Sequence, residues 1–167
     1  MKSDCLIAAI LSAALLSQPV AAQEESLVSF KELAPETALE LARATLLACR
    51  KQGYQVAVSV VDRMGVVQVT LRDRYAGAHT PGAATRKAWT AASFRTNTLD
   101  MMEETQPGKP QSGTRFVDQA LFTGGGVKVE AGGSVVGAVG VSGAPLGELD
   151  DACAKAGITA IEDKLLF

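Results

Sequence analysis

Histidine and cysteine are scarce in this sequence, which contains one histidine and three cysteines in 167 residues. This scarcity excludes a zinc finger, an all-cysteine zinc site and a histidine cluster built within one chain. Positive charge is not in excess either, because the sequence has 16 Lys and Arg residues and 18 Asp and Glu residues. The basic residues are also scattered along the sequence rather than clustered. The chain therefore lacks the electrostatic footprint of a nucleic-acid-binding protein, and we predict no nucleic-acid partner.

Proline is infrequent as well, with six residues, whereas 47% of the chain is hydrophobic. This composition argues against a disordered chain, and the length fits one globular domain. Long apolar runs are missing: Cys5–Leu16 is shorter than the roughly 20 residues that a membrane-spanning helix needs, and no later segment is apolar enough. We therefore predict no membrane span.

The first 22 residues have the pattern of a signal peptide. A short head with one lysine precedes the apolar run Cys5–Leu16, and Val20-Ala21-Ala22 supplies the small residues of a signal-peptidase site. The alternative is a buried N-terminal helix. The signal-peptide interpretation predicts a mature protein of residues 23–167 that is periplasmic or secreted.

Two cysteines, Cys49 and Cys153, remain after such a cleavage. An exported protein meets an oxidising compartment, so the two residues can form a disulfide that links the first and last helices. They can equally be free, small apolar residues of the core. The sequence leaves both alternatives open, because it does not place their Cα atoms.

Apolar periodicity predicts three main helices and two β-hairpins. Thr80 and Pro81 have the pattern of an N-cap and a first helical position. The expected elements, in order, are a helix from Pro35 that stops at Gly53, strands at 55–62 and 66–72, a helix to Phe94, a loop at 105–115, a short helical piece at 116–122, strands at 127–130 and 134–142, and a helix at 146–166. Hairpins imply an antiparallel sheet with helices on its faces, hence a single α+β domain.

Glycines gather near the C-terminal hairpin. The segment 123–129, TGGGVKV, lacks the spacing of a phosphate-binding loop and precedes a strand. Gly125 and Gly126 are therefore expected to permit a sharp turn or the close approach of a ligand or another chain segment. Gly137 and Gly140, within the last strand, leave gaps that a packed helix or a flat ligand can fill.

Any histidine-dependent chemistry of this chain must use His79, because it is the one histidine in the sequence. A haem iron needs only one axial protein ligand, and a neutral imidazole can supply it, so His79 is the candidate metal ligand. Arg74, Arg86 and Lys87 are near it in sequence and can pair with haem propionates. The alternative is a structural or solvated His79, with Arg86 and Lys87 on the solvated face of a helix.

Three stretches together resemble the GlcG/HbpS-like family, also called the haem-degrading domain family. They are VSVVDRMGVVQVTLRDR at 58–74, HTPGAATRKAWTAASF at 79–94 and GGVKVEAGGSVVGAVGVSGAPLGELDDACAKAGI at 125–158. They match a V-V-D-x-x-G hairpin, an A-x-x-K-A-x-T-A helix and a long glycine-rich strand followed by D-x-x-x-A-x-A-G. The resemblance gives a lead at 23–32 and a GlcG/HbpS-like domain at 33–167.

The resemblance implies a profilin- or PAS-like domain with a central antiparallel sheet, assembled as a homo-oligomer. Some exported members bind haem and take part in haem or redox sensing, and related domains are fused to corrinoid adenosyltransferases. It implies a haem site at His79 or Thr80, with Arg74, Lys87, Gly125 and Gly126 as further cofactor-binding candidates.

The function expected from these observations is an exported haem-binding accessory protein. The alternatives are a non-haem small-molecule sensing or interaction module, and an accessory protein of hydroxy-acid (glycolate) metabolism. We do not predict an enzyme, because the sequence offers no recognisable nucleophile–base pair and no complete metal site.

Overall fold

The computed structural model describes residues 26–166. The chain divides into two compact units, residues 1–30 and 31–167, and the described part of the first unit, 26–30, contains no helix or strand. The predicted signal peptide lies outside the described residues. All elements below belong to the second unit.

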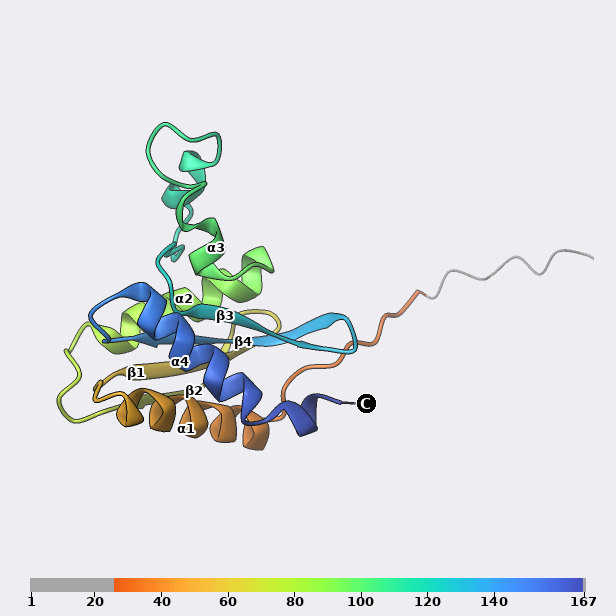
Figure 1. Ribbon diagram of the computed structural model, residues 1–167. Helices are drawn as coiled ribbons and strands as arrows, with labels where there is room; N and C mark the ends of the chain where they lie inside the picture. The colour runs from red at the N-terminus through yellow and green to blue at the C-terminus, as the bar shows by residue number, and fades with distance from the viewer. Residues whose placement is uncertain (1–25, 167) are drawn as a thin grey trace, which may run out of the picture. The chain divides into compact units, whose positions relative to one another are not determined.

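Four strands form one antiparallel sheet in the order β2-β1-β4-β3 (Figure 1). They are β1 (Ala57–Asp62), β2 (Val67–Arg72), β3 (Gly126–Ala131) and β4 (Ser134–Ser142). β1 and β4 pair in the centre, with Val60 opposite Val139. The two predicted hairpins are therefore confirmed, and the structure adds that their inner strands join them into one sheet.

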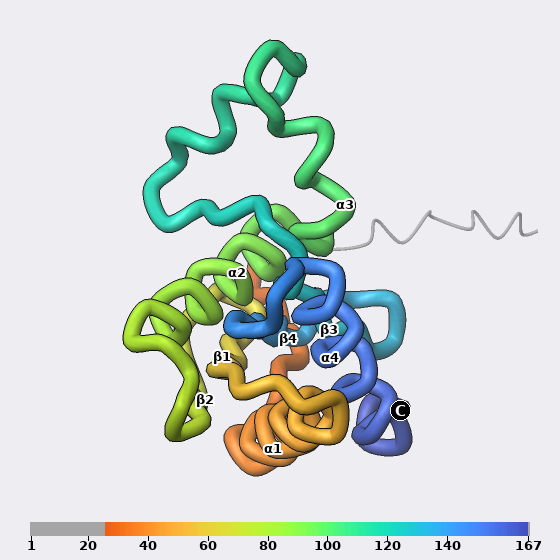
Figure 2. Tube along the Cα trace, turned by 60° about the vertical axis from the view of Figure 1, so that its left-hand side comes forward, coloured from red at the N-terminus to blue at the C-terminus, as the bar shows by residue number. Residues whose placement is uncertain are grey.

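The sheet lies between two layers of helices. α1 (Pro35–Lys51) and α4 (Gly147–Thr159) pack against one face, and α2 (Thr80–Phe94) covers the other (Figures 1 and 2). The larger core is on the α1 and α4 side. Its strand residues are mostly valines, such as Val58 and Val60 of β1, and the helices add leucines, alanines and the two cysteines. The predicted α+β fold with an antiparallel sheet flanked by helices is confirmed.

Missing side chains in β3 and β4 let α2 approach the sheet closely. A Cβ placed on Gly140 would lie 2.0 Å from the carbonyl oxygen of Ala84, and one on Gly126 would lie 2.3 Å from that of Lys87. Of the two occupants expected at Gly140, the packed helix is the one present. Gly137 serves the other face, where Leu33 packs against it.

A disulfide joins α1 to α4. Cys49 and Cys153 are both fully buried, and their Cα atoms are 5.3 Å apart, a normal spacing for a bridge. One helical turn away, a Cβ on Gly157 would lie 1.9 Å from the Oγ1 atom of Thr45, so the two helices are in close contact there. Of the two alternatives that the sequence left open, the structure thus contains the disulfide.

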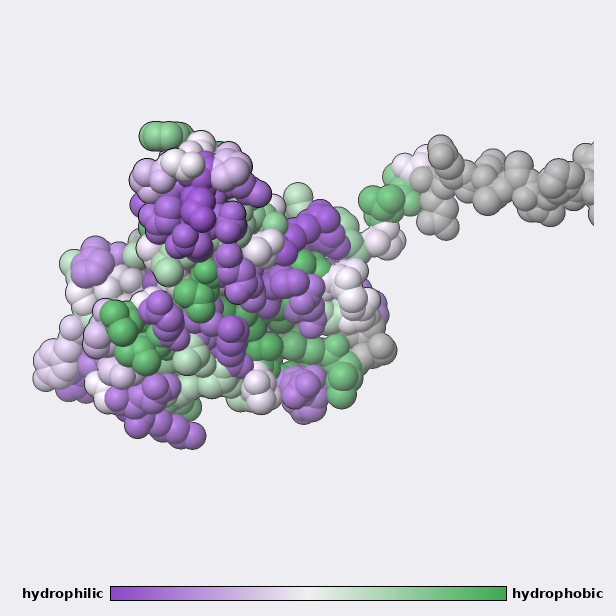
Figure 3. Space-filling model, turned by 45° about the horizontal axis from the view of Figure 1, so that its top comes forward, coloured by the Kyte–Doolittle hydropathy of each residue, from purple (hydrophilic) through white to green (hydrophobic). Residues whose placement is uncertain are grey.

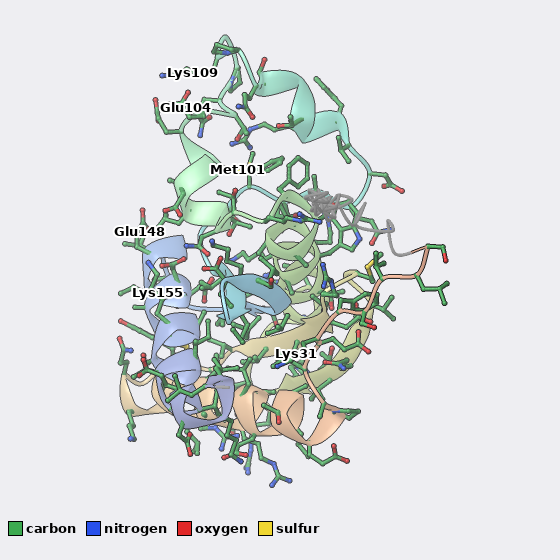
Figure 4. All side chains as sticks on the ribbon, turned by 90° about the vertical axis from the view of Figure 1, so that its right-hand side faces the viewer. Lys31, Met101, Glu104, Lys109, Glu148 and Lys155 are labelled. Atoms are coloured by element: carbon green, nitrogen blue, oxygen red, sulfur yellow. A yellow bond between two sulfur atoms is a disulfide. The ribbon has the colours of Figure 1, made fainter. Side chains whose placement is uncertain are left out.

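Residues 95–123, here called the arm, leave the end of α2, extend away from the sheet and return to β3 (Figures 1 and 2). The arm contains α3 (Thr98–Met102) and a 3₁₀ turn, η1 (Ser112–Phe116). Arg115 holds its two sides together by donating to the carbonyl oxygens of Thr105 and Met102. The face of the arm seen in Figure 3 is mostly hydrophilic, and Glu104 and Lys109 project outward from it in Figure 4.

Two predicted helix bounds are wrong. The helical piece expected at 116–122 is η1 at Ser112–Phe116, because Val117 is extended, with φ −66° and ψ 127°, and ends the turn. The last helix, expected to reach 166, ends at Thr159, because Ile161 leaves helical geometry with φ −117° before a second 3₁₀ turn, η2 (Glu162–Leu165). In addition, His79 rather than Thr80 precedes the first residue of α2.

Candidate functional site

A cleft of about 390 Å³ lies beside the first half of α2. It is bounded by the residues before β1, the end of β4, the loop that leads into α4 and the returning segment of the arm. Its lining is largely polar and consists of Gln55, Tyr75, Gly77, His79, Thr80, Ala83, Lys87, Leu121, Thr123, Ser142, Gly143, Ala144, Gly147 and Asp150. The volume is within the range of small-molecule sites.

His79 lies at the exposed rim of this cleft, directly before α2. A Cβ on Gly77 would lie 2.9 Å from the Nδ1 atom of His79, so the imidazole folds back over a residue without a side chain. The ring makes no hydrogen bond or ion pair with any other residue that the structure describes. Its nitrogens are therefore available to a ligand or a metal ion.

Thr80 lines the cleft but is 1% exposed. Its hydroxyl donates to the carbonyl oxygen of Gly77 at 2.8 Å, and its backbone N–H contacts the same oxygen at 3.0 Å. The side chain therefore closes the turn that carries His79. This bond explains why Thr80 does not cap the helix as the sequence predicted.

Lys87 and Asp150 form a buried ion pair at the inner end of the cleft. The distance between Nζ and Oδ2 is 2.9 Å, and the side chains are 6% and 4% exposed. Lys87 Nζ also donates to the carbonyl oxygen of Val141 at 2.9 Å, and Asp150 Oδ1 accepts from the backbone N–H of Ala144 at 3.0 Å. The pair thus connects α2, the end of β4 and α4.

Burial sets the protonation equilibrium of Asp150. Desolvation raises the pKa of its carboxyl above the usual value of 3.8, whereas the charge and hydrogen bond of Lys87 and the backbone N–H groups of Ala144 and Gly143 oppose that rise. Such a carboxylate is stable in the ionised form only while the ammonium of Lys87 stays beside it.

The structure brings three of the predicted site residues together and separates the other three. His79, Thr80 and Lys87 line one cleft, whereas Arg74, Gly125 and Gly126 do not line it. The guanidinium carbon of Arg74 lies 5.9 Å from the ring centre of Tyr75, which does line the cleft.

The glycines lie behind the ion pair. A Cβ on Gly125 would be 2.7 Å from the Cβ of Asp150 and 3.1 Å from Lys87 Nζ, and Gly126 faces the backbone of Lys87. The close approach that the sequence predicted at these glycines is made by α2 and α4 of the same chain. Arg86, the other basic residue of α2 near His79, donates to the carbonyl oxygens of Gln119 and Ala120 and fastens the arm.

Sequence reasoning missed Gln55, Ser142 and Asp150 as members of the site. A signal for Asp150 was present, because it is the aspartate of the D-x-x-x-A-x-A-G motif as Lys87 is the lysine of A-x-x-K-A-x-T-A. Nothing in the sequence showed that the two charges meet.

Within residues 26–166, no helix reaches the length and apolar character that a bilayer span requires. The same residues contain no group of three or more His, Cys, Asp and Glu side chains placed to hold a metal ion. A metal at this cleft would need to arrive with ligands of its own, as the iron of haem does.

A four-stranded antiparallel sheet between helical layers, with a polar cleft at one end, defines a small α+β sandwich domain. Residues 33–159 match the family described as haem degrading protein HbpS-like, and the chain belongs to this family. The resemblance drawn from its three motifs is confirmed.

Solved structures agree with this assignment. The crystal structure of a double mutant of HbpS from Streptomyces reticuli is 38% identical, with a TM-score of 0.76 over 87% of this chain and 97% of that one. The crystal structure of a PduOC–haem complex is 30% identical, with a TM-score of 0.72 over 78% of this chain and 95% of that one.

Among curated proteins, the corrinoid adenosyltransferase PduO of Citrobacter freundii is 31% identical over 136 residues, which is 80% of this chain. The chain spans only 39% of the length of that relative. The likeness therefore concerns one part of the larger protein.

Proposed function

We propose that this protein binds haem in the cleft at the start of α2, with the imidazole of His79 as the axial ligand of the iron. The observation that carries the proposal is the position of His79: it is the one histidine of the chain, it lies at the cleft rim, and its ring has no partner among the described residues. The similar PduOC protein has been crystallised with haem, which supports the same ligand class here.

The residues of the cleft fit such a ligand in two ways. Bound haem supplies an iron with a position for one imidazole, and the exposed rim leaves His79 accessible. The inner end contains Lys87 and hydroxyl and amide groups, which suit the carboxylates of haem rather than its apolar ring. Arg74 near Tyr75 adds a positive charge beside the rim.

Export is part of this proposal. The signal-peptide pattern of residues 1–22 supports it, and so does the Cys49–Cys153 bridge, because disulfides persist in oxidising compartments. The role would be that of an accessory protein that takes up haem or senses it. The homo-oligomer expected from the family resemblance stays a prediction, which light scattering of the mature protein would measure.

A second candidate is binding of a small non-haem ligand, as in a sensing module or an accessory protein of hydroxy-acid metabolism. The polar lining of the cleft favours it, since hydrophobic side chains predominate in typical cofactor pockets. No Soret change on haem addition, together with saturable binding of a small organic acid, would select this candidate.

The test is a haem titration of residues 23–167, followed by absorbance, on the wild type and on His79→Ala. We expect saturable, near-stoichiometric binding with a Soret band whose position changes in the variant. Thr80→Ser keeps the buried hydroxyl and serves as the matched control, with an unchanged spectrum. Absence of saturable binding to the wild type would overturn the proposal, and an unchanged spectrum in His79→Ala would overturn the ligand assignment.

A further inference from the structure

One hydrogen-bond donor of Lys87 has no partner within the part of the chain that the structure describes. An ammonium carries three N–H groups, and two of them donate to Val141 O and Asp150 Oδ2, each at 2.9 Å. The side chain is 6% exposed, yet it lines the cleft. A buried donor without a partner is unfavourable, so the third N–H is available to an acceptor that enters the cleft.

Each of the two oxygens of Asp150 already accepts a hydrogen bond from the protein. Oδ2 accepts from Lys87, and Oδ1 accepts from the backbone N–H of Ala144. Asp150 therefore holds the ammonium of Lys87 in place and acts as a positioning residue.

Two further donors line the same cleft. The hydroxyl of Ser142, a residue that is 8% exposed, and the side-chain amide of Gln55 form no side-chain hydrogen bond with the residues described. Together with Lys87 they offer N–H and O–H donors from three segments of the chain. A group that consists mainly of acceptor oxygens complements such a set, and a carboxylate is the common organic group of this kind.

We propose that the inner end of the cleft is a carboxylate subsite, in which Lys87, Ser142 and Gln55 donate to one carboxylate of the ligand. Lys87 then bridges two carboxylates, that of the ligand and that of Asp150, which offsets part of their repulsion. The inference rests on the proposed function when the carboxylate is a haem propionate. A free small carboxylate is the other source of the same chemistry.

The first arm of the test changes the ligand rather than the protein, so folding is not at issue. Haem and its dimethyl ester, in which both propionates are esterified, are titrated into residues 23–167 in the same detergent buffer. We expect haem to bind about tenfold or more tightly than the ester. Ser142→Ala and Gln55→Ala should weaken haem binding and leave ester binding unchanged. Equal affinity of the wild type for haem and its ester would overturn the propionate assignment.

The second arm uses sodium propionate without haem, monitored by amide chemical shifts, with the neutral propionamide as control. Binding of propionate alone, weakened in Ser142→Ala and in competition with haem, supports a subsite shared with haem. Propionate binding in a protein that does not bind haem supports the subsite and overturns the proposed haem function. Tight haem binding with no propionate binding and no effect of esterification overturns the subsite and leaves the haem function standing.

Discussion

Lys87 and Asp150 are 63 residues apart in the sequence, and their side chains meet at 2.9 Å with almost no solvent exposure. This pair ties α2, which begins directly after the candidate ligand His79, to α4, which contains Cys153 of the disulfide. Removing one partner leaves a buried charge without compensation, which is typically far more costly than the pair is stabilising. The pair therefore has consequences for both stability and pH dependence.

Asp150 should make the protein less stable as the pH rises. Because burial raises the pKa of its carboxyl in the folded state, the folded protein keeps the proton at pH values where the unfolded chain has lost it. The contribution of Asp150 to stability is thus greatest below the ordinary pKa of 3.8 and declines as the pH rises through the folded-state pKa.

The measurement is the free energy of unfolding in urea at a series of pH values, for the wild type and Asp150→Asn. The stability of the wild type relative to the variant should fall as the pH increases from about 3.8 upward. A relative stability that grows with pH over this interval would mean that Lys87 outweighs the burial of the carboxyl.

The disulfide should stabilise the domain by cross-linking α1 and α4 across 104 residues of chain. We expect the double variant Cys49→Ala, Cys153→Ala to lose about 2–4 kcal/mol of unfolding free energy. Chemical denaturation with and without reductant checks this, and thiol titration of the denatured wild type should find no free thiol in the mature chain. Two free thiols, or a midpoint indifferent to reductant, would contradict the bridge.

Gly140 should not tolerate a side chain. Gly140→Ala places a Cβ 2.0 Å from the carbonyl oxygen of Ala84, so α2 must move away from the sheet. We expect a loss of about 1–3 kcal/mol. The matched control is Gly82→Ala in α2, where a Cβ meets nothing within 4 Å. This variant should gain up to about 1 kcal/mol of unfolding free energy. Equal changes in stability for the two variants in thermal unfolding would show that α2 does not pack closely against Gly140.

Arg115 should protect the arm from proteolysis. Its guanidinium donates to two carbonyl oxygens across the arm and lies 6.0 Å from the ring centre of Phe122. Arg115→Ala is expected to be cut faster within residues 103–114 by a protease that does not require basic residues. Lys109→Ala removes only an exposed ion pair to Glu103 and should be cut at the wild-type rate. Identical rates for all three proteins would contradict this role.

Local patterns in the sequence were enough to predict most elements and their antiparallel pairing. Val-rich alternation on either side of Arg63-Met64-Gly65 predicted the first hairpin, and the turn is closed by Asp62, whose Oδ1 accepts from the backbone N–H groups of Met64 and Val66. Helix ends were predicted less well, because 3₁₀ turns at 112–116 and 162–165 depend on tertiary contacts that periodicity does not report.

The site could be predicted only in part for the same reason. His79 was identified from its rarity, and its accessible position at the cleft rim follows from the turn before α2. Lys87 was read as a charge near the ligand or on a solvated face, whereas the structure buries it against Asp150. Which charges pair across 63 residues is decided by how α2 and α4 pack on the sheet, and a single sequence carries no record of that.

The most direct test of haem binding at His79 is a crystal structure of residues 23–167 grown with haem. We expect haem in the cleft at the start of α2, with the iron bound by the imidazole of His79 and one propionate at Lys87. Haem bound on another surface of the protein, or an iron without His79, would contradict it.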